Sequence, residues 1–324
     1  MAIRNIYKCC YWCKKELKYF VMNVEIIEMP VDYGASRHGS DMGPSAIRLA
    51  GLRQQLEELG HNVITNESKI DITPQEFADI GSNPRAKYLE PIVKACTSLA
   101  GVVEKAVEKG NFPLVLGGDH SIVLGSLAGL DSVYRKKEFR LGVLYVDAHG
   151  DFNTSETTLS GNIHGECLAA SAGYGLSELV NLHHEGIKVN PQNICYVGLR
   201  DLDPGEKILM KDAGVTAFTM SDIDRQGFSE ILKKVKLFFK TRCDVVHVSF
   251  DMDALDPMFA PGTGIPLPGG LNYREALLLM EEMSELGLVS SMEIVEVNPV
   301  LDVRNQTAAM AVELASRLLG KKIF

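Results

Sequence analysis

The sequence lacks the short motifs that identify several common enzyme classes. It contains no Gly-x-Ser-x-Gly nucleophile elbow, no Walker-type Gly-Lys-Ser/Thr and no Gly-x-Gly-x-x-Gly. The first motif carries the catalytic serine of α/β-hydrolases, and the other two cradle phosphate groups at the start of a helix. Their absence argues against a serine hydrolase of that type, a P-loop NTPase and a dinucleotide-binding enzyme.

Positive charge and long apolar runs are also scarce. Lys and Arg number 33 against 42 Asp and Glu, which gives a net charge of −9 and a pI near 5.5. An acidic chain is poorly suited to nucleic acid or to an anionic membrane, so we expect neither as a partner. No apolar run approaches the roughly eighteen residues of a membrane span, and the N-terminus has no signal-peptide core. These features predict a cytoplasmic protein.

The cysteines do not suggest a disulfide framework. They number seven, and four of them lie among apolar residues as reduced core thiols do: Cys96, Cys167, Cys195 and Cys243. The other three, Cys9, Cys10 and Cys13, lie in a leader rich in Arg, Lys and Tyr. Cys10 and Cys13 have the spacing of a redox motif, but no strand context supports that interpretation. We expect residues 1–22 to be a loosely ordered extension of a single domain that spans residues 23–324.

From Val24 onward, apolar runs alternate with amphipathic stretches. The runs predict buried strands at Val24–Met29, Phe112–Leu116, Leu141–Val146, Ile194–Val197, Val245–Phe250 and Leu288–Val295. Helical patterns predict helices at Gly43–Leu59, Pro91–Lys109, Ser121–Leu130, Tyr273–Leu286 and Thr307–Leu319. This alternation predicts an α/β protein with a three-layer α/β/α architecture and a mostly parallel central sheet. Ligands of such proteins gather at the carboxyl ends of the strands.

Three of the predicted strands are followed by acidic and imidazole groups. These groups are His120, Asp147, His149, Asp151, Asp251 and Asp253. A lone Asp-x-His or Asp-x-Asp usually belongs to a solvated loop or a helix cap. Three such groups at one edge of a sheet would bring four carboxylates together, with a formal charge of about −4 that raises their pKa values. Two divalent cations would neutralise this charge, so the sequence predicts a dinuclear metal site.

The spacing of the motif Asp147–Asp151 sets a condition on the backbone. Side chains at i and i+2 of a strand point the same way about 6.7 Å apart, so Asp147 and His149 can flank one small cluster. In an extended chain Asp151 would lie about 13 Å from Asp147, too far for ligand bonds of roughly 2.0–2.2 Å. The chain must therefore bend after the strand, and we expect Gly150 to allow the bend.

The ligand set also indicates the metal and the type of reaction. Carboxylates and imidazoles without thiolates suit Mn²⁺ first, with Zn²⁺, Co²⁺ and Mg²⁺ as alternatives. Two such ions about 3.5–4 Å apart bind a water molecule and lower its pKa toward neutrality, which predicts a hydrolysis. His164, in the loop Ser160–Gly165, is a candidate for proton transfer to the leaving group. Glu296, at the end of a predicted strand, is either a loop carboxylate or a substrate anchor.

These motifs together resemble the ureohydrolases, the arginase and agmatinase family, and within it the bacterial arginases in particular. The resemblance runs from about Val24 to the C-terminus. Its most specific parts are Gly117–Ser121, Asp147–Asn153, Ser160–Gly165 and Ser249–Asp253. Agmatinases share the metal motifs but do not usually have the Asp-x-Asn-Thr and Ser-Gly-Asn-x-His-Gly pair. The resemblance therefore favours an arginase with the fold of that family.

The resemblance implies hydrolysis of L-arginine to L-ornithine and urea, with two Mn²⁺ ions in each subunit. One ion would be bound by His120, Asp147, Asp151 and Asp251, and the other by His149, Asp147, Asp251 and Asp253. A hydroxide that bridges the two ions would attack the guanidinium carbon. In this mechanism Asp151 steadies the tetrahedral intermediate, His164 passes a proton to the departing amine, and Glu296 pairs with the guanidinium.

The resemblance also implies how the amino-acid end of the substrate is bound. The implied contacts are Asn153, Thr158 and Ser160 for the α-carboxylate, with Asn162 beside them, and Asp203 for the α-amino group, with Glu206 nearby. Agmatine lacks the carboxylate, so neutral donors for this group discriminate against it. Ile265 departs from the family pattern, because a threonine is usual at this position near Glu296.

The sequence also leads to an expectation about the oligomeric state and leaves two alternative functions open. The resemblance suggests a homo-oligomer, either a trimer or a hexamer, with a role in arginine metabolism such as the urea cycle. The chain could instead be an amidinohydrolase that acts on agmatine or a guanidino acid. It could also be a catalytically silent, metal-binding regulatory subunit. The presence of all six predicted ligands, together with His164 and Glu296, favours an active enzyme over a silent subunit.

Overall fold

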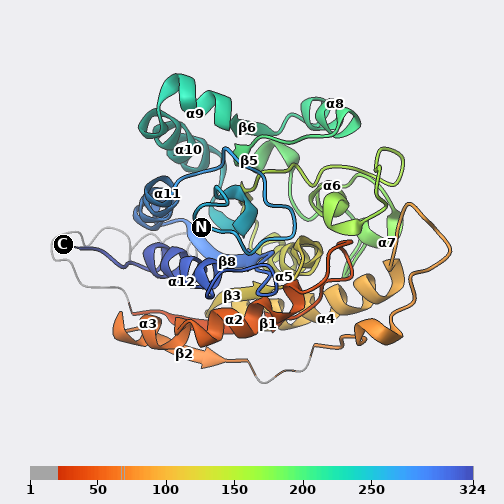
Figure 1. Cartoon of the computed structure of the whole chain (residues 1–324), viewed down its shortest axis with the longest axis horizontal. Coiled ribbons are helices and arrows are strands. Elements are labelled where there is room, and N and C mark those ends of the chain that lie inside the picture. The colour runs from red at the N-terminus through yellow and green to blue at the C-terminus, as the bar shows by residue number, and fades with distance from the viewer. Residues whose placement is uncertain (1–20, 67, 69, 324) are drawn as a thin grey trace.

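The computed structural model describes residues 21–66, 68 and 70–323. These residues form one sheet of eight strands, ordered β2-β1-β3-β8-β7-β4-β5-β6, and all of its strand pairs are parallel (Figure 1). The strands are β1 (Asn23–Met29), β2 (Asn62–Thr65), β3 (Phe112–Gly117), β4 (Leu141–Val146), β5 (Ile194–Leu199), β6 (Thr216–Thr219), β7 (Val245–Asp251) and β8 (Val289–Val295). The parallel sheet predicted from the apolar runs is confirmed.

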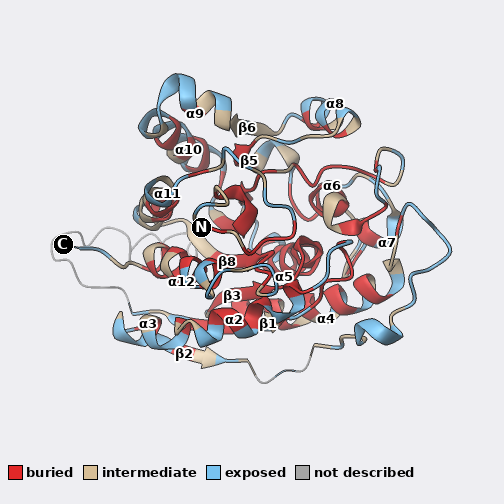
Figure 2. Cartoon of the chain, in the orientation of Figure 1, coloured by how far each residue is buried: buried red, intermediate tan, exposed pale blue. Residues whose placement is uncertain are grey.

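Helices cover both faces of the sheet and bury two hydrophobic clusters against it. Residues of one cluster come from α2 (Gly43–Leu49), α3 (Leu52–Glu58), α9 (Met220–Gln226), α10 (Phe228–Arg242), α11 (Tyr273–Leu286) and α12 (Gln306–Leu318). Residues of the other come from α4 (Leu89–Glu108), α5 (Val123–Lys136), α6 (Cys167–Ser171), α7 (Ser177–Val180) and α8 (Pro204–Ala213). Figure 2 shows that buried residues concentrate in the sheet and the helices beside it.

Alternation along the strands explains the three layers. In β4, Leu144 and Val146 belong to the first cluster, whereas Val143 and Tyr145 belong to the second. Successive side chains of a strand point to opposite faces, so a fully apolar strand must be covered on both. The predicted three-layer α/β/α fold is therefore confirmed.

The strand order brings together motifs that are far apart in the sequence. Strands β3, β8, β7 and β4 are consecutive neighbours in the middle of the sheet. Because they are parallel, their carboxyl ends lie at the same edge. The segments that follow them, which begin at residues 118, 296, 252 and 147, therefore meet at this edge.

One predicted helix was wrong, and two strands of the structure were not predicted. The helix expected at Gly43–Leu59 is interrupted, because Gly51 has a left-handed φ of 92° between α2 and α3. The strands β2 and β6 were not predicted. Each has only four residues and pairs along one side only, as edge strands do, so neither requires an apolar run.

The structure tests the prediction for the four core cysteines but not the prediction for the N-terminal extension. Cys9, Cys10 and Cys13 lie outside the described residues, as does nearly all of the predicted extension 1–22. The other four cysteines are buried and free, as expected of core thiols. None of the described helices combines the length and the apolar character needed to cross a bilayer.

Candidate metal centre and active site

The six predicted ligands form two adjoining groups at the carboxyl edge of the sheet. In one group, His120 Nδ1 lies 3.1 Å from Asp147 Oδ2 and 3.2 Å from both Asp151 Oδ2 and Asp251 Oδ2. In the other, His149 Nδ1 lies 3.1 Å from Asp253 Oδ2 and 3.4 Å from Asp147 Oδ1. Asp147 belongs to both groups and presents a different oxygen to each. The structure thus brings together all six side chains from three separate segments.

The electrostatics of these groups fit a pair of cations. Asp147 Oδ2 is buried and has no hydrogen-bond donor among the described residues. Burial, followed by the charges of Asp253 and Asp151, raises the pKa of Asp147 to about 6. Burial also raises the pKa of Asp251 well above its usual value. Divalent cations would stabilise the ionised form of these carboxylates, and one of them would bind Asp147 Oδ2, which lacks a hydrogen-bond donor. Atoms of His120, Asp147 and Asp251, and of Asp147, His149 and Asp253, lie close enough to hold metal.

A buried network behind His120 selects the ring nitrogen that faces the carboxylates. His120 Nε2 lies 2.7 Å from Ser249 Oγ, and Ser249 donates its hydroxyl proton to Glu293 Oε1, also at 2.7 Å. Because that proton is already used, Ser249 accepts from His120 Nε2–H, which leaves Nδ1 free to bind a cation. Sequence reasoning missed both residues. Their positions in buried strands, at i−2 and i−3 from Asp251 and Glu296, were the available signal.

The bend after β4 occurs, but Gly150 does not supply its unusual backbone conformation. Asp151 adopts a left-handed φ of 48°, a region that Asp tolerates better than most residues. Gly150 is needed for a close approach instead, because a Cβ at this position would lie 2.7 Å from Glu206 Oε1. The chain therefore turns as expected. Gly150 leaves room for Glu206 at this turn, and the left-handed conformation belongs to Asp151.

His164 and Glu296 are paired beside the metal groups. His164 Nδ1 lies 3.2 Å from Glu296 Oε1, and the backbone N–H of His120 donates to the same oxygen at 3.0 Å. Burial lowers the pKa of His164, but the hydrogen bond that its ring donates to Glu296 and the charges of Glu296, Asp151 and Asp119 together outweigh burial and raise the value to about 9. A raised pKa favours the protonated imidazolium of His164, which can donate a proton.

A cavity of about 210 Å³ opens over these residues. Its lining includes four of the predicted ligands, His164 and Glu296, together with Asn153, Thr158, Ser160, Asp203, Glu206 and Ile265. Asp201, Leu202 and Gly165 also line it and were not predicted. Asn162 is the exception among the predicted substrate residues. It is not part of the lining, and its side chain hydrogen-bonds to Ser36 Oγ at 2.9 Å.

Glu206 supports the cavity wall through its carboxylate. Its Oε1 accepts from the backbone N–H of Phe152 at 2.8 Å, and its Oε2 accepts from that of Asp203 at 3.1 Å. Burial raises its pKa to about 7. Asn153 Nδ2 donates to Asp203 Oδ2 at 3.0 Å, so these two residues are already in contact. Both oxygens of Glu206 thus bind backbone N–H groups, whereas the side chains of Asp203 and Asn153, which also line the cavity, bond to each other.

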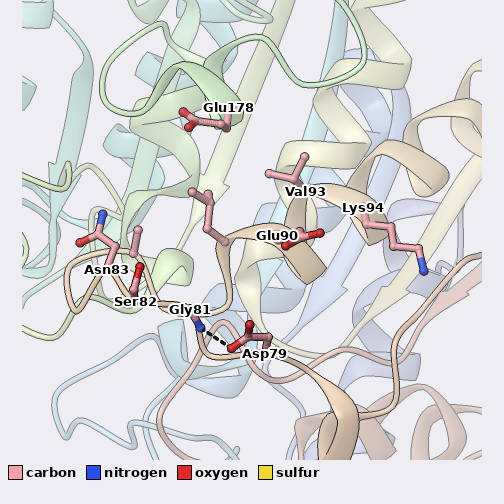
Figure 3. Close-up of a pocket in the computed structure, with 10 residues that line it drawn as sticks. Asp79, Gly81, Ser82, Asn83, Glu90, Val93, Lys94 and Glu178 are labelled. Atoms are coloured by element: carbon pink, nitrogen blue, oxygen red, sulfur yellow. Dashed lines mark hydrogen bonds between the residues drawn. The ribbon is translucent and has the colours of Figure 1, made fainter.

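A larger cavity, of about 480 Å³, lies elsewhere (Figure 3). It is lined by nine residues between Asp79 and Lys94 and by Glu178 of α7. Figure 3 shows the hydrogen bond that the backbone N–H of Gly81 donates to Asp79. It also shows Glu90, Val93 and Lys94, which belong to α4. None of the predicted ligands lines it. Of the two cavities, only the smaller one is lined by predicted ligands.

Comparisons with known families, protein sequences and solved structures agree with one another. A model of the arginase family matches residues 22–320. The arginase of Bacillus subtilis (strain 168) is 46% identical over 300 residues, which cover 93% of this chain and 98% of the relative. The solved arginase of Bacillus caldovelox superposes with a TM-score of 0.89 at 43% identity, over 94% of this chain and 100% of the other. The Entamoeba histolytica arginase in complex with L-ornithine has a TM-score of 0.83 at 33% identity, over 93% and 99%.

Proposed function

This chain belongs to the arginase family, and we propose that it hydrolyses L-arginine to L-ornithine and urea. The observation that carries this proposal is the cavity that is lined by four of the predicted ligands, by the His164–Glu296 pair and by the loop with Asn153 and Ser160. Curated arginases that are 40–46% identical over nearly their whole length support it. So does the relative that was solved with L-ornithine, the expected product.

Two Mn²⁺ ions are the proposed cofactors. One would be held by His120, Asp147, Asp151 and Asp251, and the other by His149, Asp147, Asp251 and Asp253. When bound, such a pair lowers the pKa of a water molecule and so supplies a nucleophile at neutral pH. The absence of thiolates and the number of carboxylates support Mn²⁺ over softer metals.

The remaining residues orient the substrate and move a proton. Glu296 would pair with the guanidinium, because a carboxylate matches its planar set of N–H donors. His164, whose Nδ1 lies 3.2 Å from Glu296 Oε1 and whose pKa is raised, would pass a proton to the departing amine of ornithine. Asp151 would accept a hydrogen bond from the tetrahedral intermediate. These roles follow the family pattern residue by residue.

The amino-acid end of the substrate would bind at the rim of the cavity. Asn153, Thr158 and Ser160 offer neutral donors to the α-carboxylate, and Asp203 offers a carboxylate to the α-ammonium. Asn162 is the weaker part of the proposal because it faces Ser36. The proposal also includes residues 23–324 as a single catalytic domain, a cytoplasmic location and a trimeric or hexameric homo-oligomer.

The substrate assignment is tested with a panel of guanidino compounds. Metal-free protein is reconstituted with Mn²⁺, and urea is measured with L-arginine, agmatine and 4-guanidinobutyrate. We expect the highest kcat/KM for L-arginine, because only this compound has both groups that the rim can bind. A preference for agmatine or 4-guanidinobutyrate would favour another amidinohydrolase. Full metal loading without urea from any compound would favour the silent subunit.

Ile265 offers a second test of the guanidinium position. It lines the cavity with Glu296, and a Cβ on the preceding Gly264 would lie 3.3 Å from Glu296 Oε2. Ile265→Thr would supply a hydroxyl beside the substrate guanidinium, so we expect KM for L-arginine to fall roughly fivefold with little change in kcat. Ile265→Val is the matched control because valine has the same shape as threonine without the hydroxyl. An equal fall in KM for both variants would contradict the prediction.

A further inference from the structure

Tyr145 contacts two of the predicted ligands of one metal ion. It is the fifth residue of β4, two residues before Asp147, and its side chain is fully buried. Its hydroxyl donates to Asp151 Oδ2 at 2.6 Å. Its ring stacks on the imidazole of His120, with centroids 4.5 Å apart and an interplanar angle of 5°. One side chain thus constrains both a carboxylate and an imidazole that belong to the same group.

The contact with Asp151 acts on the oxygen that faces the metal group. Asp151 Oδ2 also lies 3.2 Å from His120 Nδ1. A carboxylate oxygen has two lone-pair sites, so the hydroxyl of Tyr145 can occupy one and leave the other for a cation. A Cys167 Sγ contact at 3.9 Å is much longer. Tyr145 is therefore the close neutral donor that holds this oxygen.

The position of Asp151 needs such support because it lies in a turn and not in the strand. Its φ of 48° is unusual for a residue with a side chain. Its backbone carbonyl is held by the N–H groups of Leu168 and Ala169, at 3.1 and 3.2 Å. Those bonds anchor the main chain but leave rotation of the carboxylate free. The hydroxyl of Tyr145 restricts that rotation.

The second metal group has different support. His149 is more exposed than His120, with 20% of its side chain accessible against 1%. Asp253 is held by the backbone N–H of Ala148 at 3.3 Å. The hydrogen bonds and ring contacts of Tyr145 in the described part of the chain involve His120, Asp151, Cys167 and Tyr196, and not these residues. The two groups are therefore unequal in their dependence on Tyr145.

We propose that Tyr145 is a positioning residue that sets the metal affinity of one site of the pair, through its hydrogen bond to Asp151 and its stacking on His120. The site affected is the one assigned to His120, Asp147, Asp151 and Asp251, so the inference rests on the proposed ligand set. Residues that orient metal ligands typically change metal affinity by about 10- to 100-fold when they are altered.

Tyr145→Phe tests this inference because it keeps the ring and removes only the hydroxyl. Metal-free protein is titrated with Mn²⁺ by calorimetry, and metal content is measured after dialysis against limiting Mn²⁺. We expect one of the two sites to weaken by about 10- to 100-fold while the other keeps the parent affinity. At limiting Mn²⁺ the variant should therefore hold about one equivalent where the parent holds two.

Tyr196→Phe is the matched control. Tyr196 is also fully buried, its ring lies edge-on to Tyr145 with centroids 5.3 Å apart, and its hydroxyl donates to the backbone carbonyl of Gly150 at 2.7 Å. It supports the same turn, but its hydrogen bond and its ring contact in the described part of the chain involve no predicted ligand side chain. We expect both Tyr196→Phe and Tyr145→Phe to lose some thermal stability, because each removes a buried hydrogen bond, and we expect Tyr196→Phe to keep both Mn²⁺ affinities.

Three outcomes would overturn the inference. Tyr145→Phe could bind two Mn²⁺ with parent affinities, or both of its sites could weaken equally. Tyr196→Phe could lose one site to the same extent, which would assign the effect to the turn as a whole. In each case a parent protein that binds two Mn²⁺ and releases urea would leave the proposed function intact. A parent that binds no Mn²⁺ would reject the ligand set and this inference with it.

Discussion

Asp147→Asn should remove metal from both sites and abolish activity. Asp147 presents Oδ2 to His120 and Oδ1 to His149, so each metal group includes it. Asparagine has nearly the same volume but no charge. Because ligand-orienting residues alone contribute about 10- to 100-fold to metal affinity, the loss of a shared ligand should weaken Mn²⁺ binding by more than about 100-fold. Elemental analysis after dialysis and a urea assay with L-arginine measure both effects.

The same substitution should not unfold the protein. Asp147 is fully buried among carboxylates that raise its pKa, so a neutral side chain relieves repulsion in the metal-free state. We expect a melting temperature for the metal-free variant that equals or exceeds that of the metal-free parent.

Asp119→Asn is a matched control for Asp147→Asn. Asp119 is equally buried, and burial together with the charge of Glu296 raises its pKa to about 6 as well. Its oxygens bind the backbone N–H groups of Gly34 and Ser121 and take no part in the metal groups. The Asp119→Asn variant should therefore keep two equivalents of Mn²⁺. An Asp147→Asn protein with two full equivalents would contradict the ligand assignment.

His164→Ala should have the second largest effect, on turnover and not on metal binding. His164 lines the cavity and is hydrogen-bonded to Glu296, but it belongs to neither metal group. A positioned proton donor typically contributes 10²- to 10⁴-fold to the rate, so we expect kcat to fall by about that factor. Steady-state kinetics and elemental analysis of the same preparation separate the two effects. Added imidazole should restore part of the rate, because it can supply the missing proton.

His183→Ala serves as the control for His164→Ala. His183 Nε2 lies 2.9 Å from Glu104 Oε2, so it is also a histidine paired with a glutamate, but it lies outside the cavity. Its removal should leave kcat unchanged. An unchanged kcat in His164→Ala would reject the role of proton donor, and loss of Mn²⁺ from this variant would indicate that His164 is a ligand.

The sequence was sufficient for the central strands and the ligand-bearing motifs. Leu141–Val146 and Tyr273–Leu286 were predicted with the bounds that the structure has. Such elements are detectable because burial on both faces, or on one face of a helix, leaves a local pattern of apolar residues. Edge strands leave a weaker pattern, and for that reason β2 and β6 were missed.

The supporting residues could not be recognised in the same way. Ser249 and Glu293 lie on different strands, and their contact depends on the pairing of β7 with β8. Glu206 was predicted near the substrate and lines the cavity, but the sequence did not show that its oxygens also bind the backbone N–H groups of Phe152 and Asp203. A side chain of the same type can bind substrate or backbone, and only its surroundings distinguish the two.

The sequence by itself determined the type of sheet, the identity of the six predicted ligands and the hydrolytic chemistry that they favour. These depend on residue type and on spacing within short segments, which local geometry constrains. Only the tertiary structure decided that β3, β8, β7 and β4 are neighbours, that Asp147 faces both groups of predicted ligands, and that Tyr145 contacts Asp151 and His120. These features arise from contacts between residues far apart in the chain, and such contacts follow from strand order and packing.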